Sequence, residues 1–432
     1  MSASTLNFPT LWRYPYTLKR PRLPGKTVYI VGSGINFPLG IPVMQNFIHD
    51  GIKELARNAW NSKTPDRKRK SLEKTLESIR NIVNIQRRVL NYGDAQPTME
   101  DLCSLVHLAG TKEQQDDVSD FIRQVCLTAG REWDGGWKFR KNDNLLIQRE
   151  HFITQSAHET AQLGPSSMGR DLLRVDLYES FLSQLRFPSE TITCEPRFKE
   201  ASPDLCRNAI VTFNYDTVFE DVMKRLESRV GPVPALEPYY GSFSEGAERW
   251  NICGTIGKKS RANTPLRDNQ FPIIKIHGSI NWVRHKRRNP EEHWVEKNDP
   301  AIERKSKASD HFPVILPSWQ RSDFNDTVYE PLVRNAIEHL RLASRWVFIG
   351  YSLPMTDLSI RYLLKVALDS PQLPEIEVCL KEPGSQQEAE EAVKKRMAEM
   401  LGRNAANQIR RGKVFHEGFE SYVKLRKENE KR

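Results

Sequence analysis

Short runs of apolar residues, separated by segments with helical periodicity, organise most of the chain. The runs lie at 27–31, 209–214, 272–278, 313–317, 345–350, 376–380 and 413–418. Each run is nearly continuous rather than alternating, which is typical of a strand buried on both faces of a parallel sheet. Helical patterns separate several of the later runs, at 217–227, 327–344, 357–369 and 386–401. The pattern therefore predicts an α/β fold with a doubly wound, mostly parallel, Rossmann-like sheet.

The stretch between the first two strands is helix-rich, from about 42 to 190. Leu72, Leu76, Ile79 and Val83 recur at helical spacing, and 171–187 has a second strongly amphipathic pattern. Thr98, followed three residues later by an acidic residue, indicates a helix start. We therefore predict three parts: an N-terminal extension at 1–26, one domain at 27–424 with a large helical insertion at about 45–190, and a charged tail at 425–432.

Composition narrows the class of protein. No run approaches the roughly 18 apolar residues of a membrane helix, and the N-terminus lacks the pattern of a signal peptide. The six cysteines form no C-x-x-C pair, so we predict neither a zinc ribbon nor a disulfide framework, and we expect a reducing, cytoplasmic location. The formal charge of +10 and the basic clusters at 65–70, 284–288 and 403–413 allow indirect contact with nucleic acid, although solvated helix ends and loops explain such clusters more simply.

The distinctive polar and glycine-rich segments of the chain follow predicted strands. They are "GSGIN" after the first strand, "TFNYD" after the second, "IHGSINW" after the third and "GYSLPMTD" after a later one. Ligands of open parallel sheets bind beyond the carboxyl ends of the strands. The four segments are therefore expected to meet in one crevice.

Taken singly, each of these segments also has a structural explanation. "GSGIN" is consistent with a tight turn, and it departs from G-x-G-x-x-G because Phe37 occupies the third glycine position. Asp216 is consistent with a helix cap, and His277 with a buried histidine that backbone groups satisfy. "GYSLPMTD" is consistent with a loop closed by Pro354 and a helix cap.

Together and in this order, the segments resemble the motifs of the sirtuin family. "GSGINFPLGIP" is similar to the sirtuin loop G-A-G-x-S-x-x-x-G-I-P, "TFNYD" to T-Q-N-x-D, His277-Gly278 to the catalytic His-Gly pair, and "GYSLPMTD" to the G-T-S-L segment. "VFHEGFESYVKL" is similar to the closing strand and loop that cover the adenine. The resemblance spans residues 27 to about 424 and implies a sirtuin-type fold with an NAD⁺ site.

Two departures from the sirtuin deacylases change the expected activity. Val43, Met44 and Gln45 stand where those enzymes have D-F-R, and the two C-x-x-C pairs of their zinc module are absent. The resemblance is therefore to the divergent sirtuin-like NAD⁺ hydrolases of bacterial antiphage defence, which need no metal. Members of that group deplete NAD⁺ in infected cells, and they pair with a HerA-type hexameric DNA-translocating ATPase or a short Argonaute, or respond to a nucleotide or phage-protein signal. The resemblance implies a gated hydrolase that acts by abortive infection, alone as a homo-oligomer or with such a partner.

The resemblance also implies roles for individual residues. For binding NAD⁺ as substrate, it implies that the backbone N–H groups of Gly32, Ser33 and Gly34 hold the pyrophosphate. Asn36 would take the place of the family serine. Gly350 and Ser352, on a later loop, would hold a phosphate or the adenosine ribose. For catalysis it implies Asn214 to hold the nicotinamide ribose and the attacking water, and His277 to accept a proton. Asp216 would contact the nicotinamide carboxamide or brace its loop.

Two other functions are compatible with the same residues. One is NAD⁺-dependent protein deacylation, which the missing D-F-R and zinc module disfavour. The other is a module that binds NAD⁺ or ADP-ribose without chemistry. The presence of both Asn214 and His277 favours an active enzyme over this second alternative.

Overall fold

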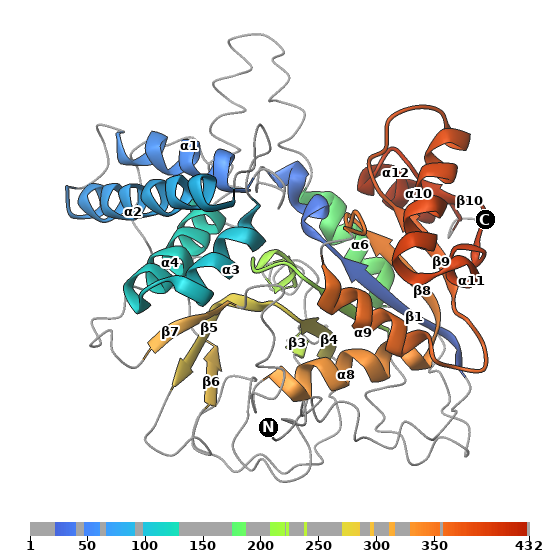
Figure 1. Ribbon diagram of the computed structural model, residues 1–432. Helices are drawn as coiled ribbons and strands as arrows, with labels where there is room; N and C mark the ends of the chain where they lie inside the picture. The colour runs from blue at the N-terminus through green and yellow to red at the C-terminus, as the bar shows by residue number, and fades with distance from the viewer. Residues whose placement is uncertain are drawn as a thin grey trace, which may run out of the picture.

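The computed structural model describes thirteen segments of the chain, and every structural statement below concerns them (Figure 1). They are residues 22–39, 47–60, 66–90, 98–128, 175–186, 208–220, 222–223, 237–239, 270–285, 294–297, 311–315, 329–354 and 357–429. The sequence segments 40–42 and 43–45, which carry part of the predicted glycine loop and its departure from D-F-R, lie outside them.

A seven-stranded parallel sheet forms the centre of the fold. Its strands are β1 (Leu23–Val31), β2 (Ala209–Thr212), β3 (Glu237–Tyr239), β4 (Gln270–Lys275), β8 (Ala343–Ile349), β9 (Glu375–Cys379) and β10 (Ile409–Phe415). Their order is β10-β9-β8-β1-β2-β4-β3, and every neighbouring pair is parallel. The predicted Rossmann-like α/β fold is confirmed.

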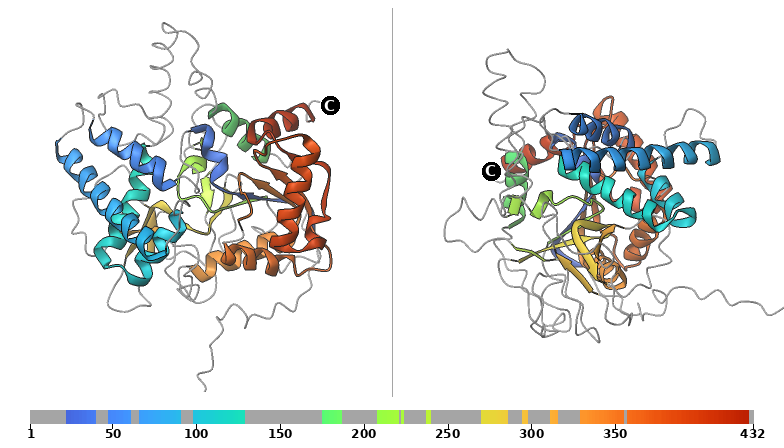
Figure 2. Two further views of the ribbon diagram at one scale, coloured as in Figure 1. Left: turned by 45° about the horizontal axis from the view of Figure 1, so that its top comes forward. Right: turned by 90° about the vertical axis from the view of Figure 1, so that its left-hand side faces the viewer.

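Helices cover both faces of this sheet, as the continuous apolar runs require (Figures 1 and 2). On one face lie α8 (Tyr329–Leu342), α9 (Leu358–Leu368), α10 (Gln386–Leu401) and α11 (Arg403–Ala406). On the other lie α6 (Val175–Arg186) and α12 (Phe419–Asn429). Side chains of β1 alternate between the two faces of the sheet. Val28 and Ile30 pack with the face covered by α8 to α11, whereas Tyr29 and Val31 pack with the face covered by α6 and α12.

Four further helices form a separate unit, which we call the helical layer. These are α1 (Phe47–Ala59), α2 (Asp66–Leu90), α3 (Met99–Ala109) and α4 (Lys112–Thr128), which pack on one another. The predicted start at Thr98 is confirmed, because its side chain accepts from the N–H of Asp101 and that carboxylate accepts from the N–H of Thr98. The predicted insertion is helical where described, but its last helix, α6, packs on the main sheet, where Phe181 contacts Tyr29.

A second, three-stranded sheet corrects one part of the prediction. It consists of β5 (Gly278–His285), β6 (Trp294–Lys297) and β7 (His311–Ile315) in the antiparallel order β6-β5-β7. The run at 313–317 was expected in the parallel sheet and instead pairs with β5. Only residues 276–277 join β4 to β5, which is too short for a parallel crossover of about a dozen residues. This sheet contacts α4 of the helical layer.

The described structure continues past residues 27 and 424, the two expected boundaries of the domain. At its start, Arg22 is buried and donates to the carbonyls of Leu340 and Ala343 at 2.9 and 2.7 Å, and β1 begins at Leu23, so residues 22–26 pack with the main sheet. At its end, α12 continues to Asn429, and Arg426 donates to the hydroxyl of Tyr29 at 2.8 Å. Among the described helices, none is both long enough and apolar enough to cross a membrane.

Candidate active site

The polar strand ends meet where the order of the sheet reverses. From β1 the sheet grows through β2, β4 and β3 on one side, and through β8, β9 and β10 on the other. Such a switch point is where ligands of open α/β sheets bind. The segments after β1, β2, β4 and β8 are connected by the contacts described below, as expected for one crevice.

The loops after β1 and β8 cross with their backbones in direct contact. The N–H groups of Gly32 and Gly34 donate to the carbonyls of Ile349 and Gly350, both at 2.9 Å. A Cβ at Gly32 or Gly34 would lie 2.7 or 2.8 Å from the Gly350 oxygen, and one at Gly350, where φ is +63°, would lie 2.2 Å from the nitrogen of Ile35. The glycines are therefore required by the crossing itself. The N–H groups of Gly32 and Gly34 already donate to the end of β8, so their hydrogen bonds do not support the expected role in holding pyrophosphate.

The loop after β2 is tied to this crossing by Asn214. This side chain is buried, and its Nδ2 donates to the carbonyl of Gly32 at 3.2 Å. Its own backbone N–H donates to the hydroxyl of Thr212 at 3.1 Å. Asn214 thus stands between the strand end of β2 and the glycine loop of β1.

Asp216 acts on both sides of the same loop. One carboxylate oxygen accepts from the N–H of Val218 at 2.9 Å, which caps the helical residues that follow. The other accepts from Nδ2 of Asn36, on the 3-10 helix η2 (Ser33–Leu39). Of the two roles expected for Asp216, the hydrogen bonds favour bracing the loop.

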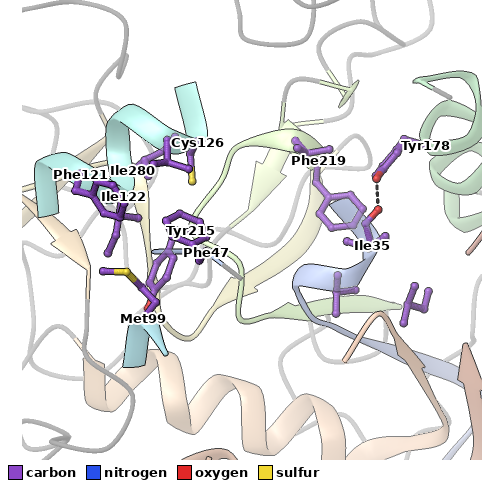
Figure 3. Packing of buried hydrophobic residues seen from close by; sticks show 14 of the residues in the cluster. Ile35, Phe47, Met99, Phe121, Ile122, Cys126, Tyr178, Tyr215, Phe219 and Ile280 are labelled. Atoms are coloured by element: carbon purple, nitrogen blue, oxygen red, sulfur yellow. Dashed lines mark hydrogen bonds between the residues drawn. The ribbon is translucent and has the colours of Figure 1, made fainter. Parts of the chain in front are cut away.

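Asn36 has an unused acceptor. Its side chain is 2% exposed, and within the described residues its Oδ1 has no hydrogen-bond partner. A buried polar atom left in this way costs about 1–3 kcal/mol, so a ligand donor at this position would recover free energy. Ribose hydroxyls of a dinucleotide are donors of that kind. The adjacent carbonyl of Ile35 accepts from the hydroxyl of Tyr178, so α6 holds this turn in place (Figure 3).

His277 lies in the two-residue turn between β4 and β5. It is 1% exposed, and its ring packs against those of Phe213 and Tyr215, with centroids 5.4 and 5.8 Å away. The turn is joined to the loop after β2 because the N–H groups of Ile276 and Ile280 donate to the carbonyls of Thr212 and Tyr215. His277 and Asn214 are therefore carried by two loops that are hydrogen-bonded to each other.

The loop after β8 contacts the loop after β2 through the aromatic ring of Tyr351. Tyr351 packs on Phe213 with ring centroids 4.7 Å apart, and its hydroxyl donates to Asp357 at 3.2 Å. Asp357 in turn caps α9, as the sequence allowed. Ser352 is exposed on this loop, and among the described residues no hydrogen bond joins its side chain to the other expected site residues.

Sequence reasoning did not identify Tyr215, which connects the site to the helical layer. Its side chain belongs to a buried cluster with Phe47 of α1, Met99 of α3 and Phe121 of α4 (Figure 3). The residue between Asn214 and Asp216 is therefore anchored outside the main sheet. The aromatic residue between the two polar residues Asn214 and Asp216 is the sequence signal that could have identified it.

Comparison with known proteins finds a similarity over part of the chain. Residues 208–400 match a family model described as a SIR2-like domain. The matched range runs from the start of β2 to α10 and includes Asn214, His277 and Gly350, which supports a sirtuin-like, NAD-binding domain. No curated protein matches the chain. In the part of the chain that the structure describes, no three His, Cys, Asp or Glu side chains gather in a way that could hold a metal ion.

Proposed function

We propose that this protein is an NAD⁺ hydrolase that cleaves the bond between nicotinamide and ribose, giving nicotinamide and ADP-ribose. The observation that carries the proposal is that the loops carrying Asn214, His277 and Asn36 are joined by hydrogen bonds at the switch point of the sheet, and that within the described residues Asn36 Oδ1 is a buried acceptor without a partner. The match of residues 208–400 to a SIR2-like domain supports NAD⁺ as the ligand.

The reaction needs orientation more than strong catalytic groups. The bond to a cationic pyridinium is already activated, and its electrons return to the ring nitrogen as nicotinamide leaves. The oxygen of a water molecule then bonds to C1′, and His277 accepts the proton that this water loses. Asn214 would orient the ribose and the water, while Asn36 would accept a hydrogen bond from a ribose hydroxyl.

The proposed biological role is depletion of NAD⁺ in antiphage defence by abortive infection. Such an activity has to be gated, since it would otherwise kill its host. The helical layer is a suitable control surface, because Tyr215 packs against it and lies between Asn214 and Asp216 in the sequence. We propose homo-oligomerisation, or a second defence protein such as a HerA-type ATPase or a short Argonaute, as the source of control. The expected cytoplasmic location stays a prediction from the cysteine pattern.

The basic cluster at 403–413 contributes less to partner binding than its sequence suggests. Arg410 pairs with Glu375 at 3.3 Å, and Lys413 pairs with Glu377 at 2.9 Å, so acidic residues of β9 offset part of its charge. We therefore propose contact with nucleic acid through a partner protein rather than through this cluster.

The test is loss of NAD⁺ with detection of nicotinamide and ADP-ribose, for wild type and for Asn214→Ala and His277→Ala. Each variant should lose about two to four orders of magnitude in rate. Matched controls are Asn58→Ala and His339→Ala, which replace a buried asparagine of the helical layer and a buried histidine of α8. The controls should retain activity in samples whose thermal unfolding shows them to be folded.

The assay is run on the protein alone and on protein co-expressed with the products of neighbouring genes. Cleavage only when an acetyl-lysine peptide is added would establish a deacylase instead. Absence of cleavage in every preparation, with NAD⁺ binding measurable by calorimetry, would replace the hydrolase with a sensing module.

A further inference from the structure

Lys275 is a buried charged residue at the candidate site that the reaction outlined above does not use. It ends β4, two residues before His277, and its side chain is 1% exposed. Its ammonium group lies 2.9 Å from the carboxylate of Glu220, which is 3% exposed. It also donates to the backbone carbonyl of Asp216. A lysine inside the apolar run "PIIKIHG" is the sequence signal for this pair.

Stability alone is a weak explanation for a buried ion pair. Removing both charges from water costs several kcal/mol per ion, and replacing such pairs by apolar residues is often neutral or stabilising. Lys275 and Glu220 come from β4 and from the helical residues after β2, so their pairing fixes these two segments relative to each other. A fixed separation between the two segments is the specific result of the pair.

Two hydrogen bonds connect Lys275 to Asn36, whose Oδ1 is the unused acceptor. Lys275 holds the carbonyl of Asp216, and the carboxylate of Asp216 holds the amide nitrogen of Asn36. Because the amide group is planar, holding its nitrogen also sets the direction of Oδ1. Lys275 is thus two hydrogen-bonded steps away from an atom that would touch the ligand.

We propose that Lys275, with Glu220 as its counter-ion, is a positioning residue that fixes Asp216 and thereby orients Asn36 Oδ1 toward a ribose hydroxyl of the dinucleotide. This inference rests on the proposed function, since it assumes that Asn36 binds NAD⁺ or ADP-ribose. It assigns to the pair a role in ligand affinity, transmitted through Asn36.

The test measures binding of ADP-ribose by calorimetry, which does not depend on turnover. Lys275→Met alone would leave Glu220 as an uncompensated buried charge, so the informative variant is Lys275→Met with Glu220→Met. The affinity for ADP-ribose should fall about tenfold or more, within the range of coupling between residues of one network. A second pair, Lys275→Leu with Glu220→Leu, makes the same change with another side-chain shape and serves if the first does not fold.

The matched control is Lys26→Met. Lys26 is also a completely buried lysine of the same sheet, but it lies on β1 five residues before the strand ends, away from the crossing of the loops. This variant should bind ADP-ribose within about twofold of wild type. An equal loss of affinity in Lys26→Met and in the double variant would overturn the proposal, because any buried lysine would then have the same effect.

A double-mutant cycle with Asn36→Ala distinguishes positioning from a general structural role. If the pair acts through Asn36, adding the double variant to Asn36→Ala should weaken binding less than about twofold further. If the losses of affinity caused by Asn36→Ala and by the double variant instead multiply when the changes are combined, the inference is overturned. Unchanged affinity for ADP-ribose in the folded double variant would also overturn it. Wild-type protein that binds neither NAD⁺ nor ADP-ribose would instead overturn the proposed function, and with it this inference.

Discussion

Replacing Lys26 should stabilise the protein at neutral pH, because the fold holds this lysine away from water beside another basic group. Lys26 is completely buried on β1, and its Nζ lies 3.1 Å from Nδ1 of His339 on α8. Burial lowers the pKa of Lys26 from 10.5 to about 7. Burial, and then the neighbouring lysine, lower the pKa of His339 well below 6.5.

The free-energy cost of burying Lys26 follows from its pKa values in the unfolded and folded states. Between about pH 7 and 10.5 the unfolded chain binds this proton and the folded protein does not, so the free energy of unfolding falls as the pH falls through that range. At about 1.4 kcal/mol per pKa unit, the cost is roughly 4 kcal/mol at pH 7 and about 1.5 kcal/mol at pH 9.5. Below pH 7 the folded protein also binds the proton, and the cost becomes constant.

Lys26→Met removes this cost but also removes a donor to the His339 ring, which costs about 1–3 kcal/mol. The variant should therefore be about 1–3 kcal/mol more stable than wild type at pH 7, and the advantage should disappear or reverse by pH 9.5. Urea denaturation followed by tryptophan fluorescence measures both values. Lys74→Met serves as the control, because its side chain is 69% exposed in an ion pair with Glu113 and should change stability by less than about 0.5 kcal/mol. A Lys26→Met protein that is less stable at pH 7, or whose difference from wild type is the same at both pH values, would refute the reasoning.

Three further changes test the loops of the site. Gly350→Ala places a Cβ 2.2 Å from a backbone nitrogen at a φ of +63° and should cost more than about 3 kcal/mol in urea denaturation, whereas Gly412→Ala, with φ +75° but open space, should cost only about 1 kcal/mol. Asn36→Asp places a second carboxylate against Asp216 and should weaken ADP-ribose binding at least tenfold at pH 8, with partial recovery toward pH 5 as one carboxylate takes up a proton; equal affinity at both pH values would contradict this. Tyr215→Ala removes a buried aromatic ring between the site loop and the helical layer and should destabilise the protein by about 3–5 kcal/mol, while an unchanged thermal midpoint would show that the layer does not depend on it.

Much of the main sheet could be predicted because its strands are buried on both faces. The helix at 386–401 was located to the residue, and in the structure Ser385 and Glu388 form a capping box at its start. The first strand was predicted four residues short because Gly25 and Lys26 are typical of a loop, although Lys26 is buried. The second sheet was missed because β5 follows β4 after a two-residue turn and lacks a continuous apolar run, whereas the apolar run that includes part of β7 was assigned to the parallel sheet.

The location of the candidate site could also be predicted, but its internal contacts could not. Parallel topology brings strand ends together, so the four polar segments were enough to predict that the loops after β1, β2, β4 and β8 contact one another. The partners of Gly32 and Gly34 are residues 349 and 350, and nothing in either segment alone specifies that contact. The pairing of Asn36 with Asp216 likewise joins residues 180 positions apart. Such contacts depend on the register between strands that are distant in sequence.

The position of β1 between β2 and β8 has a consequence for synthesis of the chain. β1 is the first strand described, yet its two hydrogen-bonded neighbours begin only at residues 209 and 343. Contacts of such long sequence separation form late and slow folding. The crossing of the two glycine-containing loops therefore cannot assemble on the ribosome until about four fifths of the chain has emerged. Truncated products that end before β8 would lack this crossing, so the hydrolase proposed above would have no completed site until most of its chain had been made.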